Sequence, residues 1–185
     1  DFVYGEHVHI PFYNVDESYK EFSVILTAPS KTFNLAGLQT SNIIIADEKL
    51  RKAYQETMNR YGVNEPNFLG IIACMTAYNE CELWVDEMLE YVYDNFTYFD
   101  EFLKENLPHI HLVKPEGLYL GWVDFRECGL NKDELEKTML EKAGLWLDEG
   151  YIFGTGGEGF ERFNLAIPRS VLEDACQRLL KAFGK

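Results

Sequence analysis

The sequence predicts an α/β chain in two parts, the first with buried strands and helices and the second a smaller α+β unit. Two short apolar runs, residues 23–27 and 42–46, are typical of strands buried on both faces. Apolar side chains that recur once per helical turn over about residues 83–106 predict a long helix that joins the two parts. We therefore expect a boundary near residue 85, which gives the parts 1–85 and 86–185.

The first part contains two further helices after its strands. The two apolar runs are joined by a segment that contains proline and glycine, which predict a loop. Asp47 is placed to cap a helix that stops at Gly62, and another helix is expected over residues 68–79.

The long helix has the clearest periodicity in the chain. Its apolar side chains recur every three or four residues and define one face, made of Trp84, Met88, Val92, Phe96, Phe99 and Leu103.

The second part combines short strands with capped helices. Strands are expected at residues 110–113, 118–123 and 145–147. An Asn cap begins a helix over residues 131–142. Ser170 and Glu173 form the pattern of a capping box, which predicts the start of the last helix.

Composition excludes several classes of protein. A net charge of −14, from 17 Lys and Arg against 31 Asp and Glu, argues against nucleic acid as a partner. No run approaches the roughly 18 apolar residues of a membrane span, so we expect a soluble, cytoplasmic protein. The four cysteines form no Cys-x-x-Cys pair, and we expect reduced thiols. The chain starts with Asp, not Met, so we expect it to begin inside a longer sequence.

Histidine spacing does not predict a metal site. His7 with His9 and His109 with His111 are each two residues apart, but no Cys or second His group completes a ligand set. The glycine-rich stretch over residues 154–159 precedes a strand and not a helix. It is therefore interpreted as a flexible loop over the substrate side and not as a nucleotide loop.

The loop between the two apolar runs carries the sharpest chemical feature. Residues 27–38 are Thr-Ala-Pro-Ser-Lys-Thr-Phe-Asn-Leu-Ala-Gly-Leu, with Lys31 among small and apolar residues. Removal from water favours the neutral, nucleophilic form of an amine, which can condense with an aldehyde. Lys31 is thus a candidate Schiff-base lysine, although most loop lysines are solvated surface charges.

This string resembles the cofactor-lysine motif of fold-type-I pyridoxal-phosphate (PLP) enzymes of the aminotransferase class I/II superfamily. The similarity is to the branch of cystathionine β-lyases, C-S lyases and maltose-regulon proteins. Further matching segments follow in the same order along the whole chain, at residues 1–6, 9–12, 119–124, 150–151, 153–154, 157, 159–160, 162–164 and 168–170.

The resemblance implies that this chain is the C-terminal half of such an enzyme. Residues 1–85 would complete the large PLP-binding domain, whose sheet is mainly parallel, and residues 86–185 would form the small domain. Lys31 would carry PLP and move the proton at the substrate Cα, and Ser30 would lie against the cofactor. The residues that hold the pyridine nitrogen and stack on the ring would precede Asp1, so we expect the chain alone to be inactive.

One departure from the family pattern concerns the cofactor phosphate. Many members carry a serine three residues before the lysine and an arginine eight residues after it. This chain has Ala28 and Gln39 at those positions.

Arg162 is the second candidate site residue. Alternation over residues 160–167 puts Phe163, Leu165 and Ile167 on one face and Arg162 with Asn164 on the other. A guanidinium fork can bind a carboxylate through two hydrogen bonds. By resemblance, Arg162 and Asn164 would bind the substrate, with Arg162 at its α-carboxylate. The alternative is an ion-paired surface arginine.

The resemblance favours β-elimination from a sulfur-containing amino acid over transamination. A homodimer with a small amino-acid substrate is implied. The rival interpretations are a class I/II aminotransferase and a non-catalytic regulatory or interaction protein, because some relatives bind a transcription activator.

Overall fold

The computed structural model describes residues 2–63 and 65–184. They form two compact units, which we call unit 1 (Val8–Asp86) and unit 2 (Phe2–His7 with Glu87–Lys185). The division falls inside one helix, α3 (Glu82–Asn106). The segment Phe2–His7, expected in the first part, belongs to unit 2. No helix in the described ranges is both long enough and apolar enough to cross a membrane.

Unit 1 pairs two short strands and carries two helices. Strand β1 (Ile25–Thr27) lies antiparallel to β2 (Asn42–Ile44), and they are followed by α1 (Glu48–Tyr61) and α2 (Phe68–Glu80). Short 3-10 helices occur at Phe12–Asn14, Glu17–Glu21 and Ala36–Leu38. The parallel pairing expected of a large-domain sheet therefore has no example among the described residues.

The predicted ends of α1 are confirmed. The Asp47 carboxylate accepts a hydrogen bond from the Leu50 amide at 2.8 Å, which satisfies one of the free N–H groups of the first turn. Gly62 follows the last turn with φ 64°, a left-handed conformation that glycine adopts without strain.

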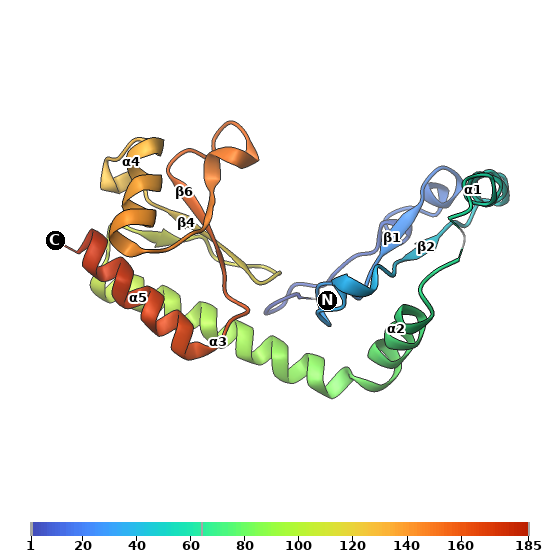
Figure 1. Ribbon diagram of the computed structural model, residues 1–185, viewed down its shortest axis with the longest axis horizontal. Coiled ribbons are helices and arrows are strands. Elements are labelled where there is room, and N and C mark those ends of the chain that lie inside the picture. Colours follow the sequence, from blue (N-terminus) through green and yellow to red (C-terminus); the bar gives the residue numbers. More distant parts are fainter. Residues whose placement is uncertain (1, 64, 185) are drawn as a thin grey trace. The chain divides into compact units, whose positions relative to one another are not determined.

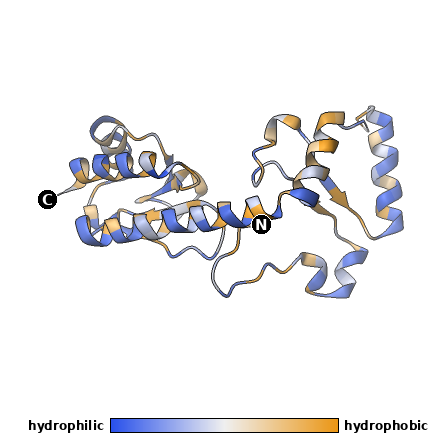
Figure 2. Cartoon of the chain, turned by 90° about the horizontal axis from the view of Figure 1, so that it is seen from below, coloured by the Kyte–Doolittle hydropathy of each residue, from blue (hydrophilic) through white to orange (hydrophobic). Residues whose placement is uncertain are grey.

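The strands of unit 1 are not buried, contrary to expectation. Leu26 is 69% exposed and Ile44 is 48% exposed. Within the described part of unit 1, the buried hydrophobic side chains are Ile45, Cys74 and Ala77, too few to cover both faces of the strand pair. Figure 2 shows hydrophobic residues along the strands, whereas α1 is mostly hydrophilic.

Unit 2 is a four-stranded antiparallel sheet with helices on one face. The strand order is β3 (His111–Leu112), β4 (Leu120–Asp124), β6 (Phe160–Asn164) and β5 (Asp148–Glu149). The other helices of unit 2 are α4 (Lys132–Lys137), a π-helical turn (Thr138–Ala143) and α5 (Arg169–Phe183), with 3-10 turns at Arg126–Cys128 and Gly150–Phe153. Figure 1 shows α3 and α5 running side by side.

The strand predicted at residues 145–147 is wrong. The apolar alternation there mimics a strand, with Trp146 88% exposed between Leu145 and Leu147, which pack on the core. However, the Leu145 amide donates to the Met139 carbonyl at 2.9 Å and so closes the preceding helix. Strand β5 begins only at Asp148.

The core of unit 2 confirms most of the predicted stripe of the long helix. Val92, Phe96, Phe99 and Leu103 are at most 2% exposed, and they pack with Val123 and Phe163 of the sheet and with Leu172, Cys176 and Leu179 of α5. Trp84, at the start of the stripe, is 49% exposed.

A buried amide ties α3 to the segment between β6 and α5. Asn95 is fully buried, and its Nδ2 donates to the carbonyls of Leu165 and Ile167, each at 2.9 Å. Its Oδ1 accepts from Nε of Arg169 at 2.8 Å. Every hydrogen-bonding group of this side chain is thereby used.

This network explains why the predicted capping box of α5 is wrong. The helix starts at Arg169 after Pro168, with no side-chain cap, so Ser170 lies inside its first turn. The Arg169 amide donates instead to the hydroxyl of Tyr91 at 2.7 Å. A long-range partner thus replaces the local cap, which spacing in the sequence cannot reveal.

Replacing Asn95 with Leu should lower the free energy of unfolding by about 3 kcal/mol, because it leaves two buried carbonyls without their donor. Urea denaturation followed by circular dichroism measures this change. Asn106→Ala is the control: Asn106 is exposed on the same helix, and its side chain donates to the Phe102 carbonyl at the helix end, so a loss below about 1 kcal/mol is expected. Equal losses for both variants would contradict the role of Asn95.

Candidate active site

Lys31 lies in a tight turn between β1 and the 3-10 helix Ala36–Leu38. The Phe33 amide donates to the Pro29 carbonyl and the Leu35 amide to the Ser30 carbonyl, both at 3.0 Å. Asn34 takes a positive φ of 54°, which Asn tolerates better than most residues. The backbone around Lys31 is thus fixed by its own hydrogen bonds.

The residues that follow Lys31 anchor the turn to the helices of unit 1. Thr32 is 7% exposed. The Phe33 ring contacts Tyr78 of α2 at 5.8 Å and stacks on Trp84 of α3 at 5.9 Å, between ring centroids. Lys31 itself is exposed and Ser30 is half-buried. The expectation of a desolvated Lys31 is therefore wrong for this chain by itself, because its neighbours turn inward and it does not.

The loop beyond the turn is held by the start of α2. Asn67 caps α2 by accepting from the Leu69 amide, and its Nδ2 donates to the Leu38 carbonyl at 3.4 Å. A Cβ on Gly70 would lie 1.9 Å from Oγ1 of Thr40, so the Thr40 side chain would have to rotate away to admit any larger residue. Gln39, where the family pattern has arginine, is exposed with φ 50°.

Arg162 lies in unit 2, on β6, one of the two central strands, and its predicted orientation is confirmed. Phe163 is buried against the helices, whereas Arg162 belongs to the opposite face. In the sheet register, Arg162 is directly opposite Trp122 of β4 and Asp148 of β5. One row of side chains therefore crosses three strands with Arg162 at its centre.

Arg162 is paired with an acid and packed against a ring. Its Nη2 and Nε donate to Oδ2 of Asp148 at 2.6 and 3.1 Å, and its guanidinium carbon lies 4.5 Å from the centroid of Phe153. The side chain of Arg162 keeps 31% of its surface exposed. The ion pair that the sequence left open as an alternative is present, and the Arg162 side chain is only partly covered.

Asn164 ends β6 on the same face as Arg162. It is exposed, and its Oδ1 accepts from the Ala166 amide at 3.0 Å. This local bond fixes the side chain at the strand end and leaves its amide nitrogen without a hydrogen-bond partner in the described residues.

The glycine-rich stretch packs backbone against backbone. An added Cβ on Gly157 would lie 2.0 Å from the Gly150 carbonyl oxygen, and one on Gly150 would lie 2.1 Å from that of Gly157. This contact closes the loop from which Phe153 reaches Arg162. Sequence reasoning identified the loop but not this packing.

Glu161 is a buried acid that sequence reasoning missed. It is 2% exposed, on the core face of β6, opposite Glu149 in the register. Burial, with the nearby charges of Glu149, Glu136 and Asp148, raises its pKa to about 8. Alternation along β6 already placed position 161 inward, and that signal could have found it.

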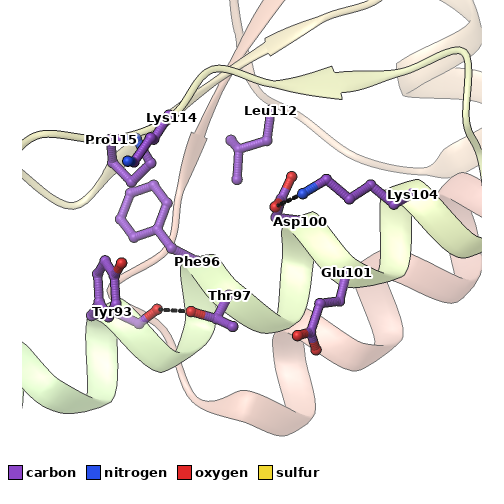
Figure 3. Close-up of a pocket in the computed structure, with 9 residues that line it drawn as sticks. All are labelled: Tyr93, Phe96, Thr97, Asp100, Glu101, Lys104, Leu112, Lys114 and Pro115. Atoms are coloured by element: carbon purple, nitrogen blue, oxygen red, sulfur yellow. Dashed lines mark hydrogen bonds and ion pairs between the residues drawn. The ribbon is translucent and has the colours of Figure 1, made fainter.

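A separate hollow of about 490 Å³ lies on unit 2 between α3 and the segment after β3 (Figure 3). Phe96, Leu112 and Pro115 line it, and Lys104 at its rim pairs with Asp100. None of the predicted site residues lines this hollow. Among the described residues, no group of three or more His, Cys, Asp or Glu is arranged to hold a metal ion.

Comparison with known proteins identifies the relatives of this chain. No family model matches it. It is 38% identical over 182 residues to cystathionine beta-lyase PatB of Bacillus subtilis and 33% identical over 183 residues to protein MalY of Escherichia coli, in each case over 98% of the chain. The chain is a homologue of PLP-dependent C-S lyases.

The fold agrees with these sequence matches. Cystalysin from Treponema denticola, whose crystal structure contains a pyridoxal 5'-phosphate cofactor, superposes with a TM-score of 0.92 at 38% identity over 98% of the chain. More distant matches are aspartate aminotransferases. The chain spans 47% of PatB and 46% of MalY and of cystalysin, about half the length of each relative. The resemblance drawn from the motifs is thereby confirmed.

The two predicted site residues belong to different units, Lys31 to unit 1 and Arg162 to unit 2. Each unit presents its residue from a backbone fixed by local contacts. Lys31 is in a hydrogen-bonded turn, and Arg162 is in the centre of a sheet row.

The free energy of unfolding should fall as pH rises because of Glu161. The folded state keeps its proton up to about pH 8, whereas an ordinary Glu loses it near 4.5, so this stabilisation is complete below 4.5 and lost between 4.5 and 8. Glu161→Gln should remove this slope and raise the melting temperature at pH 8.5 by about 4 °C.

Melting curves recorded by circular dichroism at pH 5 and pH 8.5 test this prediction. Glu158→Gln, at an exposed position two residues before β6, is the control and should leave the slope unchanged. If Glu161→Gln and the wild type show the same pH dependence, the buried acid is not its source.

Proposed function

We propose that this chain forms one half of a PLP-dependent C-S lyase that releases the sulfur-containing side chain of an amino acid by β-elimination. The observation that carries the proposal is the Lys31 motif, held in a fixed turn, in a chain 38% identical to a cystathionine β-lyase over nearly its whole length. Residues 1–85 would belong to the large domain and residues 86–185 to the small domain, joined by the helix over about residues 83–106.

The surroundings of Lys31 fit attachment of the cofactor. The side chain is exposed, and Thr32 and Phe33, which follow it, are anchored inward, so Lys31 projects outward from a fixed turn. Nζ of Lys31 would hold the cofactor aldehyde, and the half-buried Ser30 would lie beside it. When bound, PLP supplies an electron sink for the carbanion at the substrate Cα.

Lys31 would also act on the substrate as general base. Its Nζ would take the proton from the substrate Cα. The same amine can then donate a proton to the leaving sulfur group. The fixed turn supports this role because it holds the backbone from which the Lys31 side chain extends.

Arg162 would bind the α-carboxylate of the substrate. It is the arginine of the row that crosses β4, β6 and β5, and part of its side chain is exposed. Asn164 would add a hydrogen bond from its free amide nitrogen. The substrate is therefore a small amino acid, and we propose that the enzyme acts in the cytoplasm as a homodimer.

A class I/II aminotransferase is the second candidate. Both reactions begin with loss of the Cα proton, and aminotransferases are among the more distant matches. The higher identity to cystathionine β-lyase favours the lyase.

Lys31→Ala should abolish covalent cofactor attachment in the whole protein, because no other amine stands on this turn. The wild type should show a visible cofactor absorption band that borohydride bleaches, and its activity should exceed that of the variant about a thousandfold. Lys49→Ala, an exposed lysine on α1, is the control and should behave as the wild type. A bleachable band that survives in the Lys31 variant would refute the assignment.

The substrate proposal predicts pyruvate and ammonia from cystathionine, together with homocysteine, and only slow keto-acid formation from alanine or aspartate. Assays of both reactions on the whole protein decide between lyase and aminotransferase. Arg162→Ala should raise the KM for cystathionine about 100-fold, because a charge-assisted pair of hydrogen bonds to the carboxylate is lost. An unchanged KM would refute its role.

A further inference from the structure

The ion pair between Asp148 and Arg162 is set by the sheet and not by chance surface contact. The two residues are direct cross-strand partners on β5 and β6. Both hydrogen bonds from Arg162, through Nε and Nη2, end on the single oxygen Oδ2 of Asp148. This arrangement fixes one edge of the guanidinium.

The Phe153 ring holds the guanidinium from a second direction. The guanidinium carbon of Arg162 lies 4.5 Å from the ring centroid, within the range of a cation–π contact. Phe153 is in turn held edge-on by Trp122, at 5.6 Å between centroids and 76° between planes. The close contact of Gly150 with Gly157 fixes the loop that carries Phe153.

Together these contacts leave one edge of the guanidinium available. An arginine has five N–H donors, and Asp148 occupies those on the Nε side. No described residue hydrogen-bonds to Nη1 of Arg162. A second carboxylate can therefore bind end-on, through Nη1 and the remaining proton of Nη2, while Asp148 stays in place.

We propose that Asp148 and Phe153 are positioning residues that hold Arg162 with its end-on edge toward the substrate carboxylate. This inference rests on the proposed function. Because Asp148 and Phe153 act through Arg162, their removal should weaken ligands that carry an α-carboxylate and spare amines that lack one. A purely structural role would weaken both kinds of ligand.

The test compares two probes on the whole protein with its cofactor bound. L-alanine carries the carboxylate and ethylamine does not, and binding of each is followed by the change in cofactor absorption. Asp148→Ala should raise the dissociation constant of L-alanine about tenfold and change that of ethylamine less than twofold. Asp148→Asn keeps an acceptor for Nε and Nη2 and should restore about half of the lost affinity on a logarithmic scale.

Two further variants complete the design. Phe153→Leu keeps an apolar side chain without the ring and should weaken L-alanine selectively, by about threefold. Asp174→Ala removes the carboxylate paired with Arg178 on α5 and should change neither probe.

The inference is overturned if Asp148→Ala binds L-alanine as tightly as the wild type or more tightly, or if it weakens both probes equally. Failure of the proposed function is distinguishable, because the wild-type protein would then show no cofactor band or Arg162→Ala would bind L-alanine normally. A wild-type band and a weakened Arg162 variant, with no effect of Asp148→Ala, would refute this inference alone.

Discussion

The register of β6 between β4 and β5 is the constraint on which the chemistry of unit 2 depends. Successive residues of a strand face opposite sides, so one register decides every neighbour. It places Arg162 beside Trp122 and Asp148 on the open face, and Glu161 beside Val123 and Glu149 on the core face. A slip of one residue would bury the guanidinium and expose the acid.

Asn95 couples this register to the helices. Its amide binds the carbonyls of Leu165 and Ile167, directly after the last residue of β6, and its carbonyl oxygen holds Arg169 at the start of α5. The strand is thus anchored where it leaves the sheet, and the packing of Phe99 on Phe163, at 5.1 Å between ring centroids, supports the same alignment. Core packing and the placement of Arg162 on the sheet therefore depend on the same contacts.

Features that depend on residues close together in the sequence were predicted correctly. The ends of α1 follow from Asp47 and Gly62, and the facing of Arg162 follows from alternation, because each depends on residues within one turn or one strand. The partner of Arg162 could not be predicted, since Asp148 becomes its neighbour only through strand pairing. The predicted start of α5 was wrong for the same reason, because the first amide of the helix donates to the hydroxyl of Tyr91, which is distant in the sequence.

The exposure of Lys31 shows a different limit. The small and apolar residues around Lys31 in the sequence predicted that its side chain would be shielded from water. In the turn, however, Thr32 and Phe33 pack against the rest of unit 1, and the Lys31 side chain does not. Apolar character near a residue predicts where the segment packs, and not which of its side chains is enclosed. The turn fixes the lysine backbone without enclosing its amine.

The contact between Gly150 and Gly157 limits where this loop can vary. A methyl group at either position would press on a carbonyl oxygen, whereas Thr155 and Glu158, between and beside these glycines, are exposed and free of that contact. Larger side chains could therefore be introduced at those two positions while the Phe153 ring keeps its place against Arg162. The loop thus combines two glycines that cannot be enlarged with two neighbouring positions that can.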